Sequence, residues 1–123
     1  MRLLPDRTIA AVADPLDDAL AQVGDRWTLA VVRALLAGPR RYSDLSAAIE
    51  GIAPNTLADR LRRLERDGLV LARAYCQRPP RYEYELTSDG QALAPVIAAL
   101  GAWAARHAPG ADGEDDDERP VVI

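Results

Sequence analysis

Cysteine, histidine and phenylalanine are scarce in this chain of 123 residues, which has one cysteine, one histidine and no phenylalanine. The single cysteine, Cys76, cannot form an intramolecular disulfide, and one cysteine with one histidine cannot supply the usual ligands of a zinc site. The chain also lacks a glycine-rich phosphate loop and the turn that presents a hydrolase nucleophile. We therefore expect no enzyme, no catalytic residues, no metal site and no cofactor.

Long apolar runs are also absent. No run approaches the roughly 18 residues that a membrane-spanning helix needs, and residues 1–6 are too short and too charged for a secretory signal. These absences predict no membrane partner. They also predict a reducing, cytoplasmic location, at the nucleoid for a protein that binds DNA.

Lysine is missing entirely, so all 15 basic residues are arginines, against 19 acidic residues and a net charge of −4. This acidic total argues against a polyanion as partner only until the charges are mapped. Residues 24–84 carry eleven arginines and seven acidic residues, whereas six acidic residues crowd between Asp112 and Glu118. Such a run repels itself. We therefore predict a mildly basic folded part and a disordered acidic tail over residues 108–123.

Apolar spacing and capping residues divide residues 14–107 into helices and one hairpin. The predicted helices cover residues 14–23, 25–37, 43–50, 54–67 and 87–107. Their predicted N-caps are Asp14, Asp25, Ser43 and Thr87. A short extended piece is expected at 40–42, and alternating segments at 69–76 and 81–86 predict a hairpin. The order predicts a mainly helical α+β domain with a small antiparallel sheet, after an N-terminal extension over residues 1–13.

The helices at 43–50 and 54–67 have the outline of a helix-turn-helix, whose second helix enters the major groove of DNA. One face of that second helix carries leucines at helical spacing: Leu57, Leu61 and Leu64. The opposite side offers polar and charged side chains that can reach base edges and phosphates. Asp59 on that side either accepts from a cytosine or orients an arginine, and the second interpretation is favoured. A surface helix with solvated charges is the alternative, but four arginines within the seven residues 60–66 favour DNA.

The predicted DNA contacts on these two helices are polar or basic: Ser43, Asn55, Thr56, Arg60, Arg63 and Arg66. Asn55, Thr56 and Arg60 lie in the first two turns of the second helix, where bases are usually met, and are expected to read sequence. Arg63 and Arg66 are expected to bind phosphates.

The hairpin loop at 77–81 supplies a second basic element. Arg78 and Arg81 flank two prolines, which stiffen the tip. A stiff basic tip beside a recognition helix can reach the neighbouring minor groove or the backbone, so both arginines are predicted DNA contacts. The alternative is a plain proline-rich turn with solvated arginines.

Several stretches resemble the HxlR-type transcriptional regulators, in order and spacing: VGDRWTL at 23–29, LLAGPRRYSDL at 35–45, GIAPNTL at 51–57, RLRRLERDGLV at 60–70 and PPRYEYELT at 79–87. The resemblance covers residues 14–107. It implies a winged helix-turn-helix domain related to the MarR regulators, with dimerisation helices at its two ends. It also implies a homodimer on a pseudo-palindromic operator.

The last helix carries an apolar stripe that either covers its own core or pairs with a second copy, and the resemblance favours the second copy. The predicted dimer contacts are Leu16, Leu20, Leu93, Val96, Ile97, Leu100 and Trp103. A set of aromatic residues is the candidate lining of a small-molecule effector pocket: Trp27, Tyr42, Tyr75 and Trp103. In a chain without phenylalanine the core needs these residues equally, so simple packing is the alternative.

Two positions depart from the family's pattern. Asp14 stands where members usually have a cysteine before the proline of the first helix, which argues against thiol sensing by that route. Ala53 replaces the usual serine cap of the recognition helix, a loss of about 1 kcal/mol that Pro54 partly offsets. Cys76 does not replace the missing cysteine, because a lone strand cysteine is ordinarily a small half-buried apolar residue.

Together these features predict a sequence-specific regulator of transcription that binds double-stranded DNA, with repression as its expected mode. Regulation by a small-molecule effector, in place of the family's cysteine, is the expectation that accompanies it. The alternative is a winged-helix adaptor that contacts proteins and does not read DNA.

Overall fold

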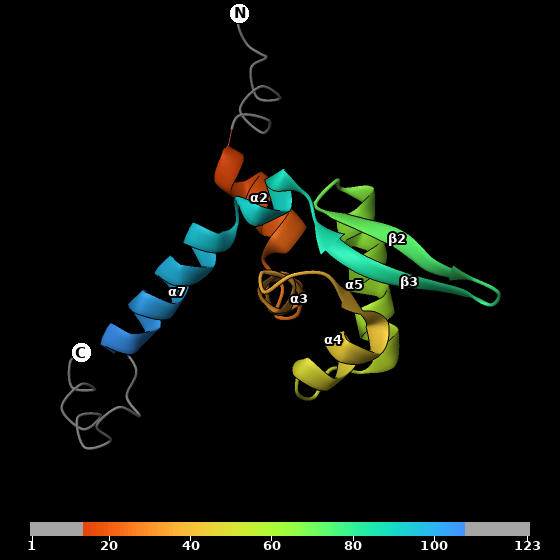
Figure 1. Ribbon diagram of the computed structural model, residues 1–123. Helices are drawn as coiled ribbons and strands as arrows, with labels where there is room; N and C mark the ends of the chain where they lie inside the picture. Colours follow the sequence, from red (N-terminus) through yellow and green to blue (C-terminus); the bar gives the residue numbers. More distant parts are fainter. Residues whose placement is uncertain (1–13, 108–123) are drawn as a thin grey trace, which may run out of the picture.

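The helical and extended segments between residues 14 and 107 are described by a computed structural model (Figure 1). The elements, in chain order, are α2 (Pro15–Val23), α3 (Thr28–Leu35), β1 (Arg40–Arg41), α4 (Tyr42–Ala48), α5 (Pro54–Arg66), β2 (Val70–Gln77), β3 (Pro80–Leu86), α6 (Ser88–Gln91) and α7 (Ala94–His107). The mainly helical α+β prediction is confirmed. The predicted extension at 1–13 and acidic tail at 108–123 lie outside the described residues.

The first two helices, α2 and α3, are connected by a tight turn. The Asp14 carboxylate accepts a hydrogen bond from the Leu16 N–H at 3.0 Å, which confirms the predicted cap of α2. Gly24 ends α2 and donates its N–H to the Leu20 carbonyl at 2.9 Å. A Cβ on Gly24 would lie 3.0 Å from the Leu20 Cα, so the turn has no room for a side chain. The prediction that Asp25 is the N-cap of the next helix is wrong, because α3 begins at Thr28 with Trp27 at the N-cap position. The Asp25 carboxylate still accepts from the N–H groups of Trp27 and Thr28 in the turn before α3.

Ser43 is not the cap of α4, contrary to the prediction. The helix begins at Tyr42, which makes Arg41 the N-cap residue and places Ser43 in the first turn. The extended piece β1 ends at Arg41, one residue before its predicted end, so the helix starts earlier than the sequence indicated. The Arg41 N–H donates to the Asp44 side chain at 3.2 Å. The turn after α4 uses Gly51 at φ +84°, a conformation that favours glycine.

Helix α5 begins at Pro54 as predicted and ends at Arg66, one residue before the predicted end. Ala53 makes no side-chain capping bond. Gly68, two residues beyond the end of the helix, has φ +79°, and its N–H donates to the Glu65 carbonyl. The Leu69 N–H donates to the Leu64 carbonyl at 2.9 Å. These two bonds satisfy carbonyls that the end of a helix otherwise leaves open.

The core lies between α3, α4, α5 and the sheet. Its buried members are Val31, Val32, Leu35, Leu45, Ile49, Ile52, Leu57, Leu61, Leu64, Val70 and Leu86. The predicted leucine face of α5 is therefore confirmed. Because that face is buried, the side chains on the other side of α5 must face outward.

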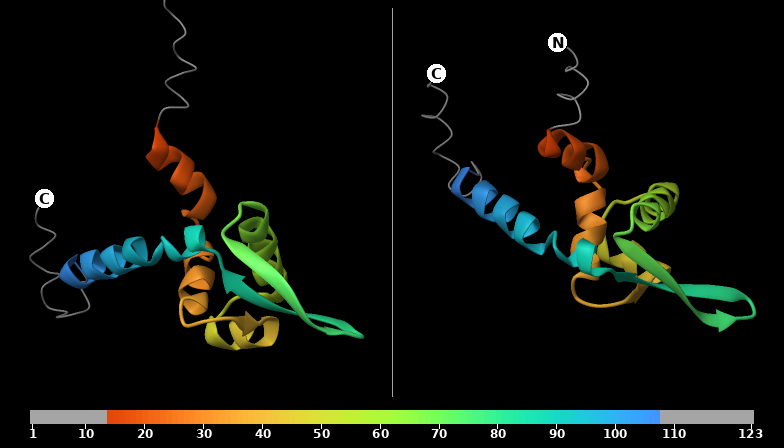
Figure 2. Two further views of the ribbon diagram at one scale, coloured as in Figure 1. Left: turned by 45° about the horizontal axis from the view of Figure 1, so that its top comes forward. Right: turned by 90° about the horizontal axis from the view of Figure 1, so that it is seen from above.

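The strands form an antiparallel sheet in the order β1-β3-β2. Arg40 pairs with Tyr84 and Val70 with Leu86, while a bulge at Tyr75 interrupts the β2–β3 register. The strands continue further than predicted, to Gln77 and Pro80, so the hairpin turn is short. The hairpin projects from one side of the domain (Figures 1 and 2).

The predicted last helix is divided in two. Thr87 caps α6, which ends at Gln91, and α7 starts at Ala94. Pro95 explains the break, because its ring cannot donate to the Gln91 carbonyl and would clash with it. Helix α7 then runs away from the domain on the side opposite the hairpin (Figure 2), and none of its residues is buried. No helix within residues 14–107 is long and apolar enough to cross a membrane.

Thr87 fastens the start of α6 to the end of α5. Its hydroxyl donates to the Gly68 carbonyl at 2.7 Å and accepts from the Gly90 N–H at 3.1 Å. Thr87→Val removes both bonds at nearly constant volume, so we expect its free energy of unfolding to fall by about 1–2 kcal/mol in urea titration. Thr87→Ser keeps the hydroxyl and is the control. An equal loss in the serine variant would contradict this role.

Candidate nucleic-acid interface

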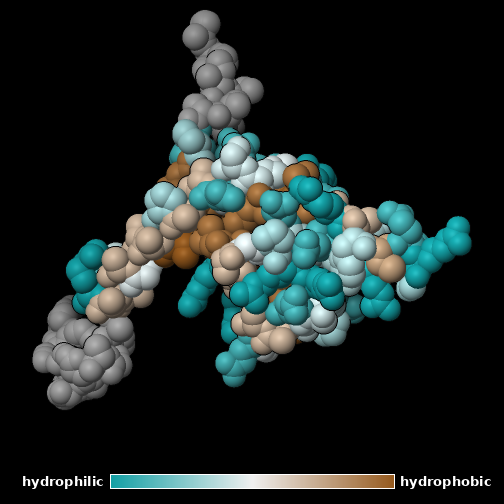
Figure 3. All heavy atoms as spheres, viewed as in Figure 1, coloured by the Kyte–Doolittle hydropathy of each residue, from teal (hydrophilic) through white to brown (hydrophobic). Residues whose placement is uncertain are grey.

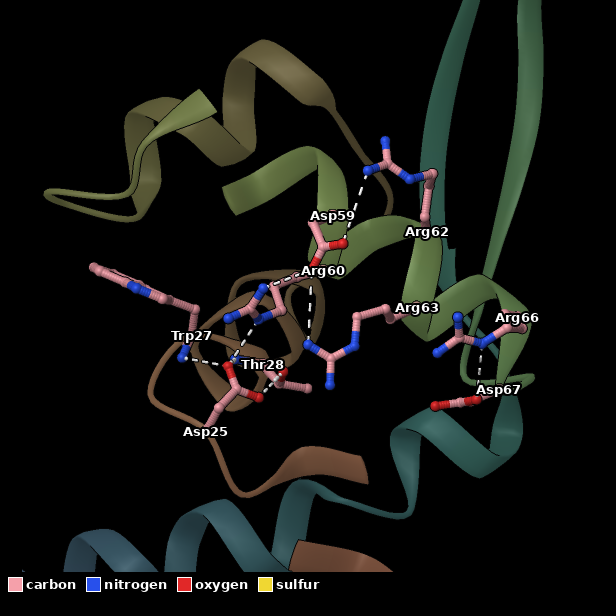
Figure 4. Close-up of polar contacts among 9 residues, drawn as sticks. All are labelled: Asp25, Trp27, Thr28, Asp59, Arg60, Arg62, Arg63, Arg66 and Asp67. Carbon is pink, nitrogen blue, oxygen red and sulfur yellow. Dashed lines mark hydrogen bonds and ion pairs between the residues drawn. The ribbon is translucent and has the colours of Figure 1, made fainter. Parts of the chain in front are cut away.

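The outward face of α5 is polar and basic (Figure 4). The Arg62 and Arg66 side chains are both 70% exposed. Asn55 at the start of the helix is exposed, and Thr56 beside it is half-buried. Arg62 was not among the predicted DNA contacts, although its position opposite the leucines was a signal for it. The face therefore combines amide and hydroxyl groups at its start with guanidinium groups near its end.

Asp59 lies among the arginines of this face. Its carboxylate is 2.7 Å from the Arg60 Nη1, 3.7 Å from the Arg63 Nη1 and 3.8 Å from the Arg62 Nη2. A carboxylate with three guanidinium neighbours orients arginines, which is the interpretation that the sequence favoured. Arg63 is thereby drawn toward the flank of the helix, with its side chain 34% exposed.

Arg60 is paired within the chain, so the role in base reading that the sequence suggested stays a prediction. Its Nε donates to the Asp25 carboxylate at 2.8 Å, and its side chain is only 19% exposed. The guanidinium thus points back to the start of α3 (Figure 4). The helical spacing placed Arg60 on the flank of α5, but it could not show that Asp25, 35 positions earlier, faces the same flank.

Asp25 is held as a carboxylate. It accepts hydrogen bonds from the Thr28 hydroxyl, from Arg60 and from the Trp27 N–H. Partial burial alone would raise the pKa of Asp25, but the bonds from Thr28, Arg60 and Trp27 together hold that pKa well below its usual range. On the other side of the pair, the bond to Asp25 raises the pKa of Arg60. The pair is therefore ionised throughout the neutral range.

The first helix of the motif is fastened to the second by Tyr42. Its hydroxyl donates to the Pro54 carbonyl at 2.8 Å, which ties the start of α4 to the start of α5. Ser43, the next residue, is exposed. The predicted contacts Ser43 and Asn55 thus lie on helix starts that a single hydrogen bond connects.

The hairpin carries basic groups along its length. Arg78 and Arg81 are exposed at its tip, where the sequence placed them. Nearer the domain, Arg73 pairs with Glu85 at 2.9 Å. Arg41 from β1 lies over the Tyr75 ring at 4.2 Å from its centre, an exposed arginine that sequence reasoning did not select. Its pairing in β1 is what turns it toward the hairpin.

The four aromatic residues predicted to line an effector pocket do not meet. Trp27 borders a hollow of about 480 Å³ between α3 and α4, together with Arg26, Arg33 and Arg40. Tyr42 and Tyr75 instead line a separate hollow of about 280 Å³ beside β3. Trp103 lies on α7, stacked on His107. These residues therefore do not share one hollow within this chain, since they lie on three separate parts of the fold, and an effector pocket lined by them stays a prediction.

Apolar side chains that the sequence assigned to a dimer remain uncovered. Those that are largely exposed are Leu16, Leu20, Val96, Leu100 and Trp103. Leu93 and Ile97 instead pack partly against the core. Figure 3 shows apolar surface gathered over α2 and along α7. Because water contact with so much apolar surface is unfavourable, this region is typical of an interaction surface.

Cys76 is half-buried in β2, with its Sγ 3.8 Å from the Arg78 carbonyl. Asp14, in place of the family's usual cysteine, is occupied as a helix cap. Between residues 14 and 107 no three histidine, cysteine or acidic side chains come together as they would around a metal ion.

Comparison with known proteins agrees with this architecture. The model of the HxlR-like helix-turn-helix family matches residues 22–112. The HTH-type transcriptional regulator YtfH of Escherichia coli is 35% identical over 106 residues, which cover 86% of this chain and 84% of that protein. The HTH-type transcriptional regulator YvaP of Bacillus subtilis is 35% identical over 88 residues, covering 72% and 82%.

Solved structures give the same result. The reduced form of the transcriptional regulator YodB from B. subtilis has a TM-score of 0.66 and 32% identity, covering 74% of this chain and 90% of that one. A MarR-family regulator from Porphyromonas gingivalis has a TM-score of 0.70 and 30% identity, covering 75% and 90%. YodB has also been solved after diamide treatment and with quinone bound.

The ionised state of Asp25 makes the free energy of unfolding depend on pH. Its pKa is depressed in the folded chain, so the carboxylate stabilises the fold above the unfolded-state pKa of about 3.9 and less and less as the pH falls below it. Asp25→Asn has no group to titrate there. We expect the wild type to exceed this variant in free energy of unfolding by about 1–3 kcal/mol at pH 7, with the difference shrinking below about pH 4. Urea titrations between pH 7 and pH 3 measure it, and a difference that grows on acidification would contradict the assignment.

Proposed function

This chain belongs to the HxlR-like helix-turn-helix family, and from that membership we propose that it is a homodimeric repressor that binds double-stranded DNA sequence-specifically. The family and the relatives are transcriptional regulators and not enzymes. Membership also implies DNA binding and dimer formation. The operator that we propose is pseudo-palindromic, since a two-fold protein dimer matches a two-fold site.

The observation that carries the proposal is the division of α5 into two faces. The leucine face is buried, so α5 is held rigidly on the domain. The other face presents Asn55, Thr56 and exposed arginines outward. A helix held in this way can enter the major groove with its first turns at the bases and its later arginines at the phosphates.

The hairpin is the proposed second DNA contact. Arg78 and Arg81 are exposed at its tip, and the hairpin projects beyond the domain (Figure 1). We place this wing, residues 77–81, at the minor groove or the backbone, where arginine binds favourably. Arg41 and Arg62 join the predicted set as exposed arginines close to the same surface.

Regulation is proposed to use a small-molecule effector and not the thiol route. The residue before Pro15 is Asp14, whose side chain is a helix cap and cannot be oxidised as a thiol can. The arginine-bordered hollow beside Trp27 is a place where an anionic aromatic molecule could bind. A protein-binding adaptor is the alternative function, and it would need no arginines aligned on α5.

DNA binding is tested by titrating the chain with a labelled duplex from its own upstream region at several salt concentrations. We expect log K to fall linearly with log salt, because phosphate contacts release counterions. Arg66→Ala should reduce the slope by about 1 with little change in sequence preference. Asn55→Ala should cost about 1–3 kcal/mol at one base position.

Arg106→Ala is the matched control, because Arg106 lies on α7, outside the proposed DNA interface. Binding that is indifferent to salt, or an Arg66→Ala slope equal to that of the wild type, would favour the adaptor. A loss in Arg106→Ala equal to that in Arg66→Ala would show that only net charge matters.

The dimer is tested on α7. Leu100 is 51% exposed on the apolar stripe, whereas Ala102 lies on the opposite side of the helix. Leu100→Asp places a charge in the proposed interface, so we expect a monomer at micromolar concentration by sedimentation. Ala102→Asp should stay dimeric. A monomeric wild type, or a dimeric Leu100→Asp variant, would contradict the assignment of this face.

A further inference from the structure

We propose that Asp25 and Arg60 form a joint that sets the orientation of the recognition helix α5 relative to the dimerisation helix α2, so that Arg60 is a positioning residue and not a base reader. The inference rests on the DNA-binding function proposed above. On this proposal, the Asp25–Arg60 pair determines the distance between the two recognition helices of the dimer.

The joint lies at the only buried end of α2. Among residues 15–23, Val23 alone is buried, so α2 is anchored to the domain at its C-terminal end. Gly24 follows in a turn too tight for a side chain. Asp25 comes next in the chain. Any tilt of α2 must therefore be transmitted to the backbone at Asp25.

Asp25 binds two elements at once. Its carboxylate accepts from the N–H groups of Trp27 and Thr28 at 3.1 and 3.3 Å and from the Thr28 hydroxyl, which fixes it to the start of α3. The same carboxylate accepts from the Arg60 Nε at 2.8 Å, which fixes it to α5. Thr28 is 2% exposed, so this junction has a rigid base.

Arg60 completes the joint by using two sides of its guanidinium. Nε bonds to Asp25, while Nη1 bonds to Asp59 at 2.7 Å on its own helix. A planar fork held by carboxylates on two elements fixes an angle as well as a distance. A lysine at position 60 has a single ammonium group and cannot reproduce that geometry.

The consequence for DNA is geometric. The exposed Leu16 and Leu20 place α2 in the proposed dimer surface, so the partner determines where α2 lies. The path from α2 through Asp25 and Arg60 then determines where α5 lies. In a dimer this path exists twice, and together the two copies set the separation of the half-sites that can be read.

Two variants loosen the joint while leaving the rest of the site intact. Asp25→Asn keeps an oxygen for the Trp27 and Thr28 caps, since asparagine caps helices as well as aspartate, but it loses the charge that holds Arg60. Arg60→Lys keeps the positive charge and loses the fork. The matched control is Arg73→Lys, because Arg73 also pairs with a carboxylate, Glu85 at 2.9 Å, but this pair joins β2 to β3 and its arginine is 64% exposed.

The probe is a duplex that the wild type selects from a random-sequence library, compared with the same duplex carrying one extra base pair between its half-sites. The assay runs at a temperature where circular dichroism shows every variant folded. We expect the wild type to prefer the natural spacing, and Asp25→Asn and Arg60→Lys each to lose about tenfold of that preference, within the range of coupled contacting pairs. The double variant should lose no more than either single variant, and Arg73→Lys should keep the full preference.

Other outcomes overturn the inference in distinguishable ways. If both variants bind more weakly but keep the wild-type spacing preference, the pair only stabilises the fold. If Arg60→Lys changes the base preferred at one position and Asp25→Asn does not, Arg60 reads a base. If the wild type selects no duplex, both the proposed function and this inference are overturned. If the wild type selects a duplex but Asp25→Asn and Arg60→Lys keep its spacing preference, only this inference is overturned.

Discussion

The packing of three leucines of α5 against α3 and the sheet determines which side of α5 faces outward, and with it the proposed DNA-binding surface. Leu57, Leu61 and Leu64 are each no more than 2% exposed, so the helix cannot rotate about its axis without exposing apolar side chains to water. That constraint holds the polar side of α5 outward. The hydrogen bond from the Tyr42 hydroxyl to the Pro54 carbonyl then holds the start of α5 against the start of α4. The orientation of the proposed recognition surface therefore depends on the packing of α5 in the hydrophobic core.

The arginines of α5 divide between internal and external roles. Arg60 is used inside the chain, where it bonds to Asp25 and Asp59. Arg62 and Arg66 are largely exposed. The chemical type is the same in all three, so the difference lies in the carboxylates that the fold brings near. A buried or half-buried arginine needs such partners, whereas an exposed one keeps its solvation until it meets a phosphate.

The ends of the domain pose the opposite problem, because their apolar groups lack a partner within the described chain. Helix α7 contains no buried residue, and α2 is buried only at Val23. Most of the core comes from the elements between them. A domain of this size gains stability when such helices are covered by a second copy. The proposed dimer thus follows from what the monomer leaves exposed, and it places α2 under the control of the partner.

The sequence by itself determined the helices, the hairpin, the leucine face of α5 and the family, because these depend on local spacing, on caps such as Asp14 and on motifs read in order. Only the tertiary structure decided the start of α4, the separation of the four aromatic residues and the ion pairs of Arg60. The pairing of β1 with β3 ends at Arg41, and α4 begins at the next residue. The break before α7, in contrast, has a local cause in Pro95, which the helical spacing of the apolar residues did not reveal. The separation of the aromatic residues and the ion pairs of Arg60 depend on contacts between residues far apart in the chain, such as Asp25 with Arg60, and no local pattern encodes which distant side chain an arginine will meet.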